Sequence, residues 1–196
     1  MPRPAEFERQ QTLDAALRLF WCQGYTATSL NQLLAAMDIG RSSFYAAFGD
    51  KRSLFVECLE LFALRTRDIL RAARDEQGSP AAIRGFFDRT LFQVPDYRAR
   101  RGCMMVNTIL ELAEVDPALS QLAADKLGEV ENDLAECFRE AQSAGDFPAG
   151  KKAEDLAACV MVINQGLRVA SRKKTSRREL RRAVDTSLSL LGLAAA

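Results

Sequence analysis

The residues that begin and end helices constrain this chain more than any other feature. Ser29 and Gln32 have the spacing of a capping box, in which each side chain bonds to the other residue's backbone N–H. A few residues later, Asp38 and Gly40 both tolerate the geometry of a sharp chain reversal. The sequence therefore predicts two short helices joined by a tight turn over about residues 29–48, which is a helix-turn-helix layout.

Apolar stripes at helical spacing predict supporting helices before and after the predicted helix-turn-helix. The stripe before the helix-turn-helix contains Leu13, Ala16, Leu17 and Phe20. Asp50 is placed to be the N-cap of a fourth helix. Its expected buried face is Leu54, Phe55, Cys58, Leu61 and Phe62, and Phe44 and Phe48 of the short third helix are also expected in the core.

Composition predicts an all-α fold and excludes several chemistries. The chain holds 30 Ala and 25 Leu but only 14 Val and Ile together, and Ala and Leu favour helices. It has no His, which excludes Ser-His-Asp catalysis and His-based zinc sites. A cysteine-dependent enzyme would need a carboxylate, Tyr or Lys as the base near Cys103, and we expect no enzyme, catalytic residue, metal or cofactor. Five scattered cysteines, no long apolar run and no signal-like start predict a cytoplasmic protein without a membrane segment.

The chain beyond about residue 66 is expected to form longer helices with wider apolar faces. Asp116-Pro117 predicts a helix reaching about residue 143, and a second is expected over about 153–170. A second capping box, Ser176 to Glu179, begins the last helix. Its expected apolar positions are Leu180, Ala183, Val184, Ser187, Leu188 and Leu191.

The segment from Phe20 to Phe55 resembles the DNA-binding domain of TetR-family transcriptional regulators. The resemblance is carried by Gly24-Tyr25-Thr26-Ala27-Thr28-Ser29-Leu30, by Ile39-Gly40-Arg41-Ser42-Ser43-Phe44-Tyr45-Ala46-Ala47-Phe48-Gly49-Asp50-Lys51, and by Leu54-Phe55. Two positions depart from the family pattern, which usually has Gly where this chain has Asp38, and His or Tyr where it has Ala47.

The resemblance implies a two-domain regulator that binds DNA as a homodimer. Residues 1–50 would be the DNA-binding domain, and residues 66–196 the effector-binding and dimerisation domain. Each subunit would place its recognition helix in a major groove of a pseudo-palindromic operator. The resemblance favours a repressor that a small-molecule or electrophile effector releases from this operator. A helical dimeric adaptor without specific DNA binding is the alternative interpretation.

The candidate DNA-binding residues combine hydroxyl groups and cations around the second and third helices. Arg41 can bind guanine or phosphate, small serines allow close approach, and Lys51 adds a charge at a helix start. The full set is Thr28, Ser29, Arg41, Ser42, Ser43, Tyr45 and Lys51, with Arg3 as a further candidate. Ser29 could equally be only a helix cap. Residues 1–52 carry six Lys and Arg against five Asp and Glu, so placement matters more than net charge.

The candidate dimer residues lie on the last two predicted helices, where the family forms a four-helix bundle. They are Leu156, Val160, Ile163, Leu167, Leu180, Val184, Leu188 and Leu191. The alternative is that these residues pack only within one chain. The basic run from Arg168 to Arg182 is expected to be a solvated connection, or to pair with the acidic stretch over residues 111–155.

Two interpretations of the effector site remain open. Arg101-Gly102-Cys103-Met104-Met105-Val106-Asn107 resembles a segment of a TetR subgroup in which some members sense electrophiles or oxidants through cysteine. Cys103, close to a helix start and to arginines, would then be reactive; otherwise it is an inert core thiol. A small apolar or aromatic ligand could instead bind among Phe62, Phe86, Phe87, Met104 and Asn107. The other four cysteines are expected in the core.

Overall fold

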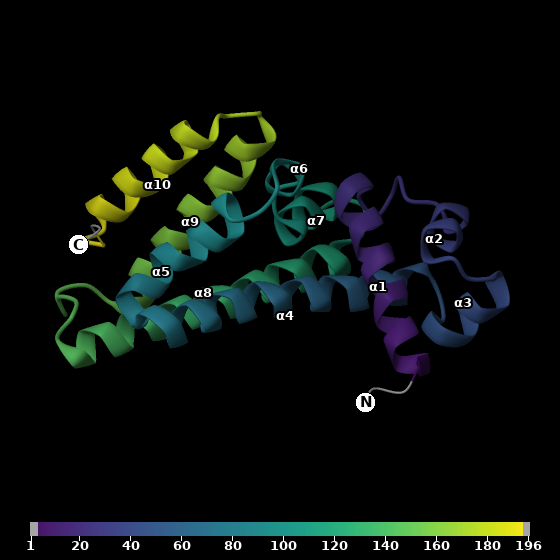
Figure 1. Ribbon diagram of the computed structural model, residues 1–196, viewed down its shortest axis with the longest axis horizontal. Coiled ribbons are helices and arrows are strands. Elements are labelled where there is room, and N and C mark those ends of the chain that lie inside the picture. Colours follow the sequence, from purple (N-terminus) through teal and green to yellow (C-terminus); the bar gives the residue numbers. More distant parts are fainter. Residues whose placement is uncertain (1–3, 194–196) are drawn as a thin grey trace. The chain divides into compact units, whose positions relative to one another are not determined.

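The computed structural model describes residues 4–193, which are helical with no strand, as the composition predicts (Figure 1). The elements are α1 (Pro4–Gln23), α2 (Leu30–Met37), α3 (Arg41–Phe48), α4 (Lys51–Gln77), α5 (Ser79–Phe87), the π-helix η1 (Asp88–Phe92), α6 (Asp96–Ala99), α7 (Met104–Leu112), α8 (Pro117–Ala144), α9 (Ala153–Arg172) and α10 (Arg177–Leu190). Arg3, a candidate DNA contact, lies outside the described residues.

The chain divides into two compact units, and each long helix α4 and α8 contributes to both. The first unit runs to Ala63 and also contains Met104–Lys126; the second contains Leu64–Cys103 and the chain from Leu127 onward. The first unit therefore includes α7 and the first part of α8 as well as α1, α2 and α3.

Helix caps form where the sequence predicts them. Ser29 and Gln32 form the capping box of α2, and Ser176 and Glu179 that of α10. Asp50 accepts a hydrogen bond from the Ser53 amide at 2.7 Å at the start of α4. At the end of α2, Asp38 adopts the left-handed conformation, with φ of 52°, so an aspartate performs the turn that glycine usually makes.

The core of the first unit is built on aromatic rings from α1, α3 and α4. Phe20 and Phe55 pack edge to face with ring centroids 4.9 Å apart, and both are fully buried. Phe44 and Phe48 are buried on the inner face of α3, as expected. Leu61 and Phe62 of α4 are only half-buried, contrary to expectation, because α4 turns Leu59 and Ala63 inward instead.

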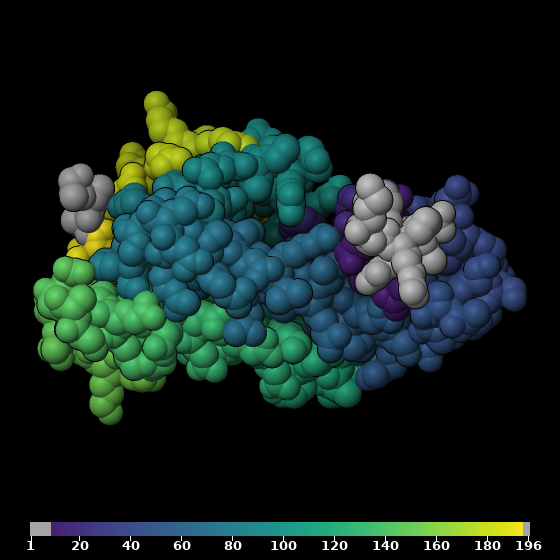
Figure 2. Space-filling model, turned by 60° about the horizontal axis from the view of Figure 1, so that its bottom comes forward, coloured from purple at the N-terminus to yellow at the C-terminus, as the bar shows by residue number. Residues whose placement is uncertain are grey.

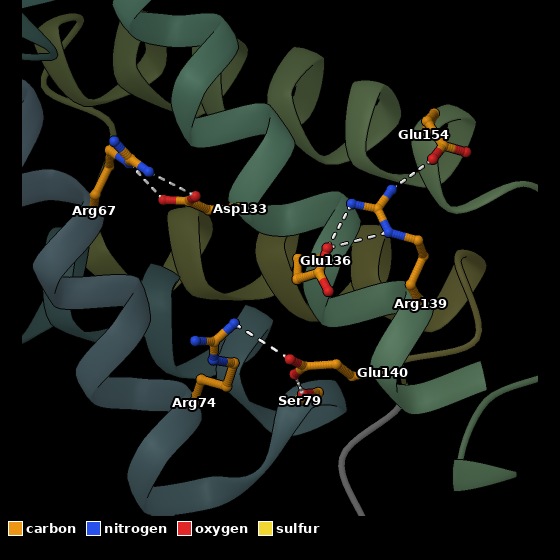
Figure 3. A network of polar contacts seen from close by, with 8 residues as sticks. All are labelled: Arg67, Arg74, Ser79, Asp133, Glu136, Arg139, Glu140 and Glu154. Atoms are coloured by element: carbon orange, nitrogen blue, oxygen red, sulfur yellow. Dashed lines mark hydrogen bonds and ion pairs between the residues drawn. The ribbon is translucent and has the colours of Figure 1, made fainter. Parts of the chain in front are cut away.

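The second unit joins α4 to α8 through ion pairs along their length (Figure 3). Arg67 makes a bidentate contact with Asp133, at 2.6 and 2.9 Å, and also donates to Glu129. Further along, Glu140 of α8 accepts hydrogen bonds from Arg74 of α4 and Ser79 of α5. Fork-shaped arginine contacts fix geometry more strongly than single contacts, so they set the register of α4 against α8.

Helices after Pro80 are shorter than expected until α8 begins. The chain there forms α5, η1, α6 and α7, of nine, five, four and nine residues, instead of long helices. Pro95 is the N-cap of α6 and prevents the preceding helix from continuing. Gly102, with φ of 73°, turns the chain before α7. No helix among residues 4–193 is both long enough and apolar enough to cross a membrane.

Most of the expected dimer residues are instead in the core of a single chain, which corrects that prediction. Relative exposure is 2% for Leu156, 0% for Val160 and 6% for Leu167. Leu180, Val184 and Leu188 of α10 are also buried, while Ile163 and Leu191 are half-buried. These apolar stripes therefore pack mainly against the chain's own helices. Ala183, expected in the same stripe, is exposed.

The basic run pairs with α6 and η1, not with the acidic stretch over residues 111–155. Arg177 binds Asp96 at 2.5 Å, and Arg181 binds Asp88 at 3.0 Å. The segments near residues 80–100 and 176–193 accordingly lie against each other, teal beside yellow in Figure 2. These contacts hold the start of α10 against η1 and α6 within the second unit.

The five cysteines are all reduced thiols, and three of them are buried. Burial raises the pKa of Cys58 far above its usual range and that of Cys137 to about 11, so both are protonated and inert at neutral pH. Cys22 and Cys159 are exposed, and their expected place in the core is wrong. Each lies on the outer face of its helix.

Candidate nucleic-acid interface

The short helix α3 presents a polar face to solvent and an aromatic face to the core. Phe44 and Phe48, four residues apart, anchor it in the first unit. The remaining residues of α3 are all exposed: Arg41, Ser42, Ser43, Tyr45, Ala46 and Ala47. Because Ser and Ala are small, this face can approach another surface closely. It is the arrangement that a recognition helix requires in a major groove.

Arg41 is the one charged residue on this face, and α2 positions it. Its Nη2 donates to Asn31 Oδ1 at 3.0 Å, an orienting contact that the sequence analysis missed. Arg41 is the first residue of α3, and Gly40 before it provides no side-chain cap. The cation and the helix amide groups together favour an anion at this end of the helix.

Tyr45 and Ser29 both reach the surface, and each also has a local role. The side chain of Tyr45 is 48% exposed, while its ring packs edge to face on Phe44 at 5.4 Å. Ser29 is exposed, but its hydroxyl group is engaged with Gln32 in the capping box. Tyr45 therefore presents a hydroxyl group that a partner can reach, whereas the hydroxyl group of Ser29 is used to cap α2.

Thr28 is not at the surface, which corrects its expected phosphate contact. Its exposure is 0%, and its hydroxyl donates to the Gly24 carbonyl at 2.6 Å. Lys51 is half-buried, with Nζ 4.4 Å from the centroid of the Tyr25 ring. Burial lowers the pKa of Lys51, although the Glu111 charge partly opposes this. The ammonium group of Lys51 is therefore engaged in a cation–π contact within its own chain.

Glu111 of α7 is the functional candidate that sequence reasoning did not identify. Its carboxylate accepts the Tyr25 amide at 3.0 Å and the Thr26 amide at 2.7 Å, both in the α1–α2 connection. Gly24 has φ of 88°, and a Cβ there would collide with this carboxylate. The Gly-Tyr pair after α1 therefore serves two needs: a left-handed turn and the close approach of Glu111. A partner 85 residues away leaves no local signal in the sequence.

Asp116 and Arg52 form a second contact between these parts of the first unit. Arg52 binds Asp116 through two nitrogens at 3.2 and 3.3 Å. The pKa of Asp116 is lowered mainly by the Leu119 amide that it caps and then by Arg52. The start of α4 and the start of α8 are thereby connected beside the helix-turn-helix.

The expected effector residues do not gather in one unit. Cys103, Phe86 and Phe87 belong to the second unit and are buried; Met104, Asn107 and Phe62 belong to the first. Phe62 is half-buried against Trp21, with centroids 5.0 Å apart. A cavity of about 750 Å³ does open in the second unit, but its walls come from residues 77–81, Arg84, Glu140, Ala141, Ala144, Asp146, Phe147, Gly192 and Leu193.

Comparison with known proteins identifies the family. The protein-family model described as bacterial regulatory proteins of the tetR family matches residues 13–58. The model described as the tetracyclin repressor-like C-terminal domain matches residues 79–187, more than half of the chain. The chain belongs to the TetR family. TetR-family proteins are transcriptional regulators that bind DNA through the helix-turn-helix, and they are not enzymes.

Individual TetR-family proteins match over nearly the whole chain. The repressor ComR of Escherichia coli is 26% identical over 190 residues, covering 96% of this chain and 90% of ComR. A structure of the regulator CifR, a cysteine mutant complexed with 26-bp operator DNA, is 31% identical, with a TM-score of 0.73 and coverage of 95% and 98%. A TetR regulator from Cytophaga hutchinsonii shares the fold, with a TM-score of 0.83 at 16% identity and coverage of 98% and 96%.

Proposed function

We propose that this protein is a homodimeric transcriptional repressor that a small-molecule effector releases from its operator. The observation that carries the proposal is the exposed face of α3. It presents Arg41, two serines and Tyr45 to solvent, while the opposite face anchors the helix through buried phenylalanines. The relative CifR is complexed with duplex operator DNA, which supports the same mode of binding here. Binding to an operator would take place in the cytoplasm.

The first test is selection of binding sites from random-sequence duplex DNA, followed by fluorescence anisotropy over a salt series. We expect an enriched site with two similar half-sites about one helical turn apart, bound more weakly as salt increases. Two subunits should bind each site. If no sequence is enriched over the starting pool, the helical adaptor becomes the better interpretation.

We propose that the subunits associate through the outer face of α9 and α10. Cys159, Val162, Gly166 and Val169 form an exposed stripe at helical spacing on α9, with Val162 68% and Val169 47% exposed. On α10 the exposed residues include Leu190, at 80%. Gly166 lets a second helix approach closely, and exposed apolar stripes of this kind are typical of protein interfaces.

A charge in this stripe should separate the subunits. For Val162→Asp we expect the dissociation constant of the dimer to rise by about 100-fold or more, because each dimer would bury two unpaired carboxylates. Sedimentation equilibrium measures this directly, and operator affinity should fall with it. Val115→Asp is the matched control, since Val115 is 66% exposed but lies between α7 and α8. Equal behaviour of the two variants would contradict the proposed interface.

We expect α7 to transmit the effect of effector binding to the helix-turn-helix. The helix begins directly after Cys103, and its last turn holds the Tyr25 and Thr26 amides through Glu111. Any displacement of α7 therefore changes the α1–α2 connection, which is the entry to the helix-turn-helix. Differential binding of effector to the two positions of α7 would supply the coupling free energy.

Glu111→Gln tests this connection. The amide group would direct an N–H at one of the two backbone N–H groups, so we expect a loss of about 1–3 kcal/mol of unfolding free energy. Operator affinity should weaken as well, because the α1–α2 connection loses its support. Glu114→Gln is the control, since Glu114 is exposed just beyond the end of α7. Unchanged urea unfolding and unchanged DNA binding in Glu111→Gln would show that α7 does not hold the helix-turn-helix.

A further inference from the structure

The cavity of about 750 Å³ lies within the second unit, where three helices end and one begins. Its walls include Gln77, the last residue of α4, Ala144, the last residue of α8, and Gly192, just beyond α10. Helix α5 begins in the same wall at Ser79. The volume is in the range of small-molecule sites. Helix C-termini carry partial negative charge, so three ends against one start favour a cation.

The ionisable groups around the cavity leave one carboxylate in excess. Two carboxylates, Glu140 and Asp146, and one guanidinium, Arg84, line it. Arg84 donates to Asp185 at 2.5 Å, so its charge is compensated within the chain. Glu140 is likewise paired, with an arginine of α4. Asp146 is exposed, and its carboxylate has no ion pair among residues 4–193. A ligand with a single positive charge would therefore balance the wall.

The rest of the cavity wall is largely apolar and includes an aromatic ring that is held in place. Phe147, which is 7% exposed, packs edge to face on Phe138 with ring centroids 5.4 Å apart. Gly192 lies against the same ring, because a Cβ there would be 3.5 Å from Phe147 Cε2. Leu193 and Pro80 add aliphatic surface. Such a wall favours an apolar or aromatic group on the ligand.

We propose that this cavity binds a small monovalent organic cation, an amine attached to an apolar or aromatic group, and that the amine acts as an effector. The ammonium group would bind Asp146 and the exposed oxygens of Glu140, and the apolar group would contact Phe147. The effector role rests on the proposed repressor function, whereas binding of the amine does not.

Glu140 connects the cavity to the contact between α4 and α8. It accepts hydrogen bonds from Arg74 of α4 and Ser79 of α5 (Figure 3). Its side chain is 43% exposed, so a ligand in the cavity can reach it. An ammonium group bound to Glu140 competes with Arg74 and loosens α4 from α8. Both helices continue into the first unit, where α8 begins at Pro117, shortly after α7. The two positions of these helices would then differ in affinity for the amine.

Calorimetry of the full-length protein without DNA tests the binding itself. The probes are phenethylamine, 4-phenylbutylamine and 2-(1-naphthyl)ethylamine at neutral pH, each compared with the alcohol of the same carbon skeleton. We expect at least one amine to bind saturably, more weakly as salt increases, and its alcohol to bind at least about 10-fold more weakly. Absence of binding by all three amines, or equal binding of amine and alcohol, would overturn the proposal.

Two variants with matched controls locate the binding site. Asp146→Lys reverses the uncompensated charge and should weaken the amine by more than about 10-fold. Asp125→Lys, at an exposed aspartate of the first unit, should bind normally. Ala144→Phe fills part of the cavity and should abolish binding, whereas Ala149→Phe, exposed but outside the wall, should not. Wild-type binding in Asp146→Lys or Ala144→Phe would place the amine elsewhere and contradict the proposed site.

The effector role is measured separately, by anisotropy on the selected operator with and without a saturating amine. We expect the amine to weaken operator binding by about 10-fold or more in the wild type and by less than about twofold in Ala144→Phe. If the amine binds but operator affinity does not change, the site stands and its effector role fails. Failure of the protein to bind any operator would leave the calorimetric result intact and would concern only the proposed repressor function.

Discussion

Replacing Arg41 by alanine together with Tyr45 by phenylalanine should abolish specific operator binding while the dimer remains intact. Both side chains lie on the exposed face of α3. A paired arginine contact with guanine contributes about 1–3 kcal/mol of discrimination, and a dimer makes it twice. With the two tyrosine hydroxyls also lost, we expect affinity to fall by more than about 100-fold.

The fold should survive this double change. Tyr45→Phe keeps the ring that packs on Phe44, and the Arg41 contact with Asn31 is exposed. Anisotropy on the selected operator measures affinity, and sedimentation measures the dimer. Arg18→Ala, which removes an exposed arginine from α1, should change affinity by less than about threefold. Retained specificity in the double variant would show that α3 does not read the operator.

Phe44→Ala should give the largest loss of stability, about 3–5 kcal/mol. Phe44 is fully buried, and its ring contacts those of Tyr45 and Phe48. An eight-residue helix is too short to persist without tertiary contacts, so loss of this anchor would detach α3 from the first unit. DNA binding would then disappear even though every exposed residue of α3 is unchanged.

Urea unfolding followed by the fluorescence of the single tryptophan, Trp21, measures this effect, because Trp21 belongs to the same unit. Tyr97→Ala is a suitable control, since it also removes an aromatic ring but from a side chain that is 64% exposed. It should cost less than about 1 kcal/mol. Similar losses in the two variants would mean that Phe44 does not anchor α3.

The all-helical fold and the helix-turn-helix could be predicted from the sequence because their signals are local. A capping box needs only residues three apart, and Ser29 with Gln32 and Ser176 with Glu179 form as predicted. Asp38 adopts the left-handed turn, and Asp50 begins α4. The spacing of Phe44 and Phe48, four residues apart among small and polar residues, also identifies the inner and outer faces of α3.

Other features were decided by tertiary structure, because they depend on which elements meet. Periodicity identifies the stripe of Leu156 and Val160 but does not say whether it faces the same chain or a partner; the structure buries it in the chain. Thr28 has the same motif context as Ser29, yet it bonds to Gly24 inside the turn. Glu111 accepts a hydrogen bond from a backbone amide 85 residues away, and Arg168 donates to a carbonyl 78 residues away, so no local pattern indicates either contact. Sequence spacing thus determined the helices and the exposed face of α3, whereas long-range packing decided which of the predicted residues are exposed and which are buried.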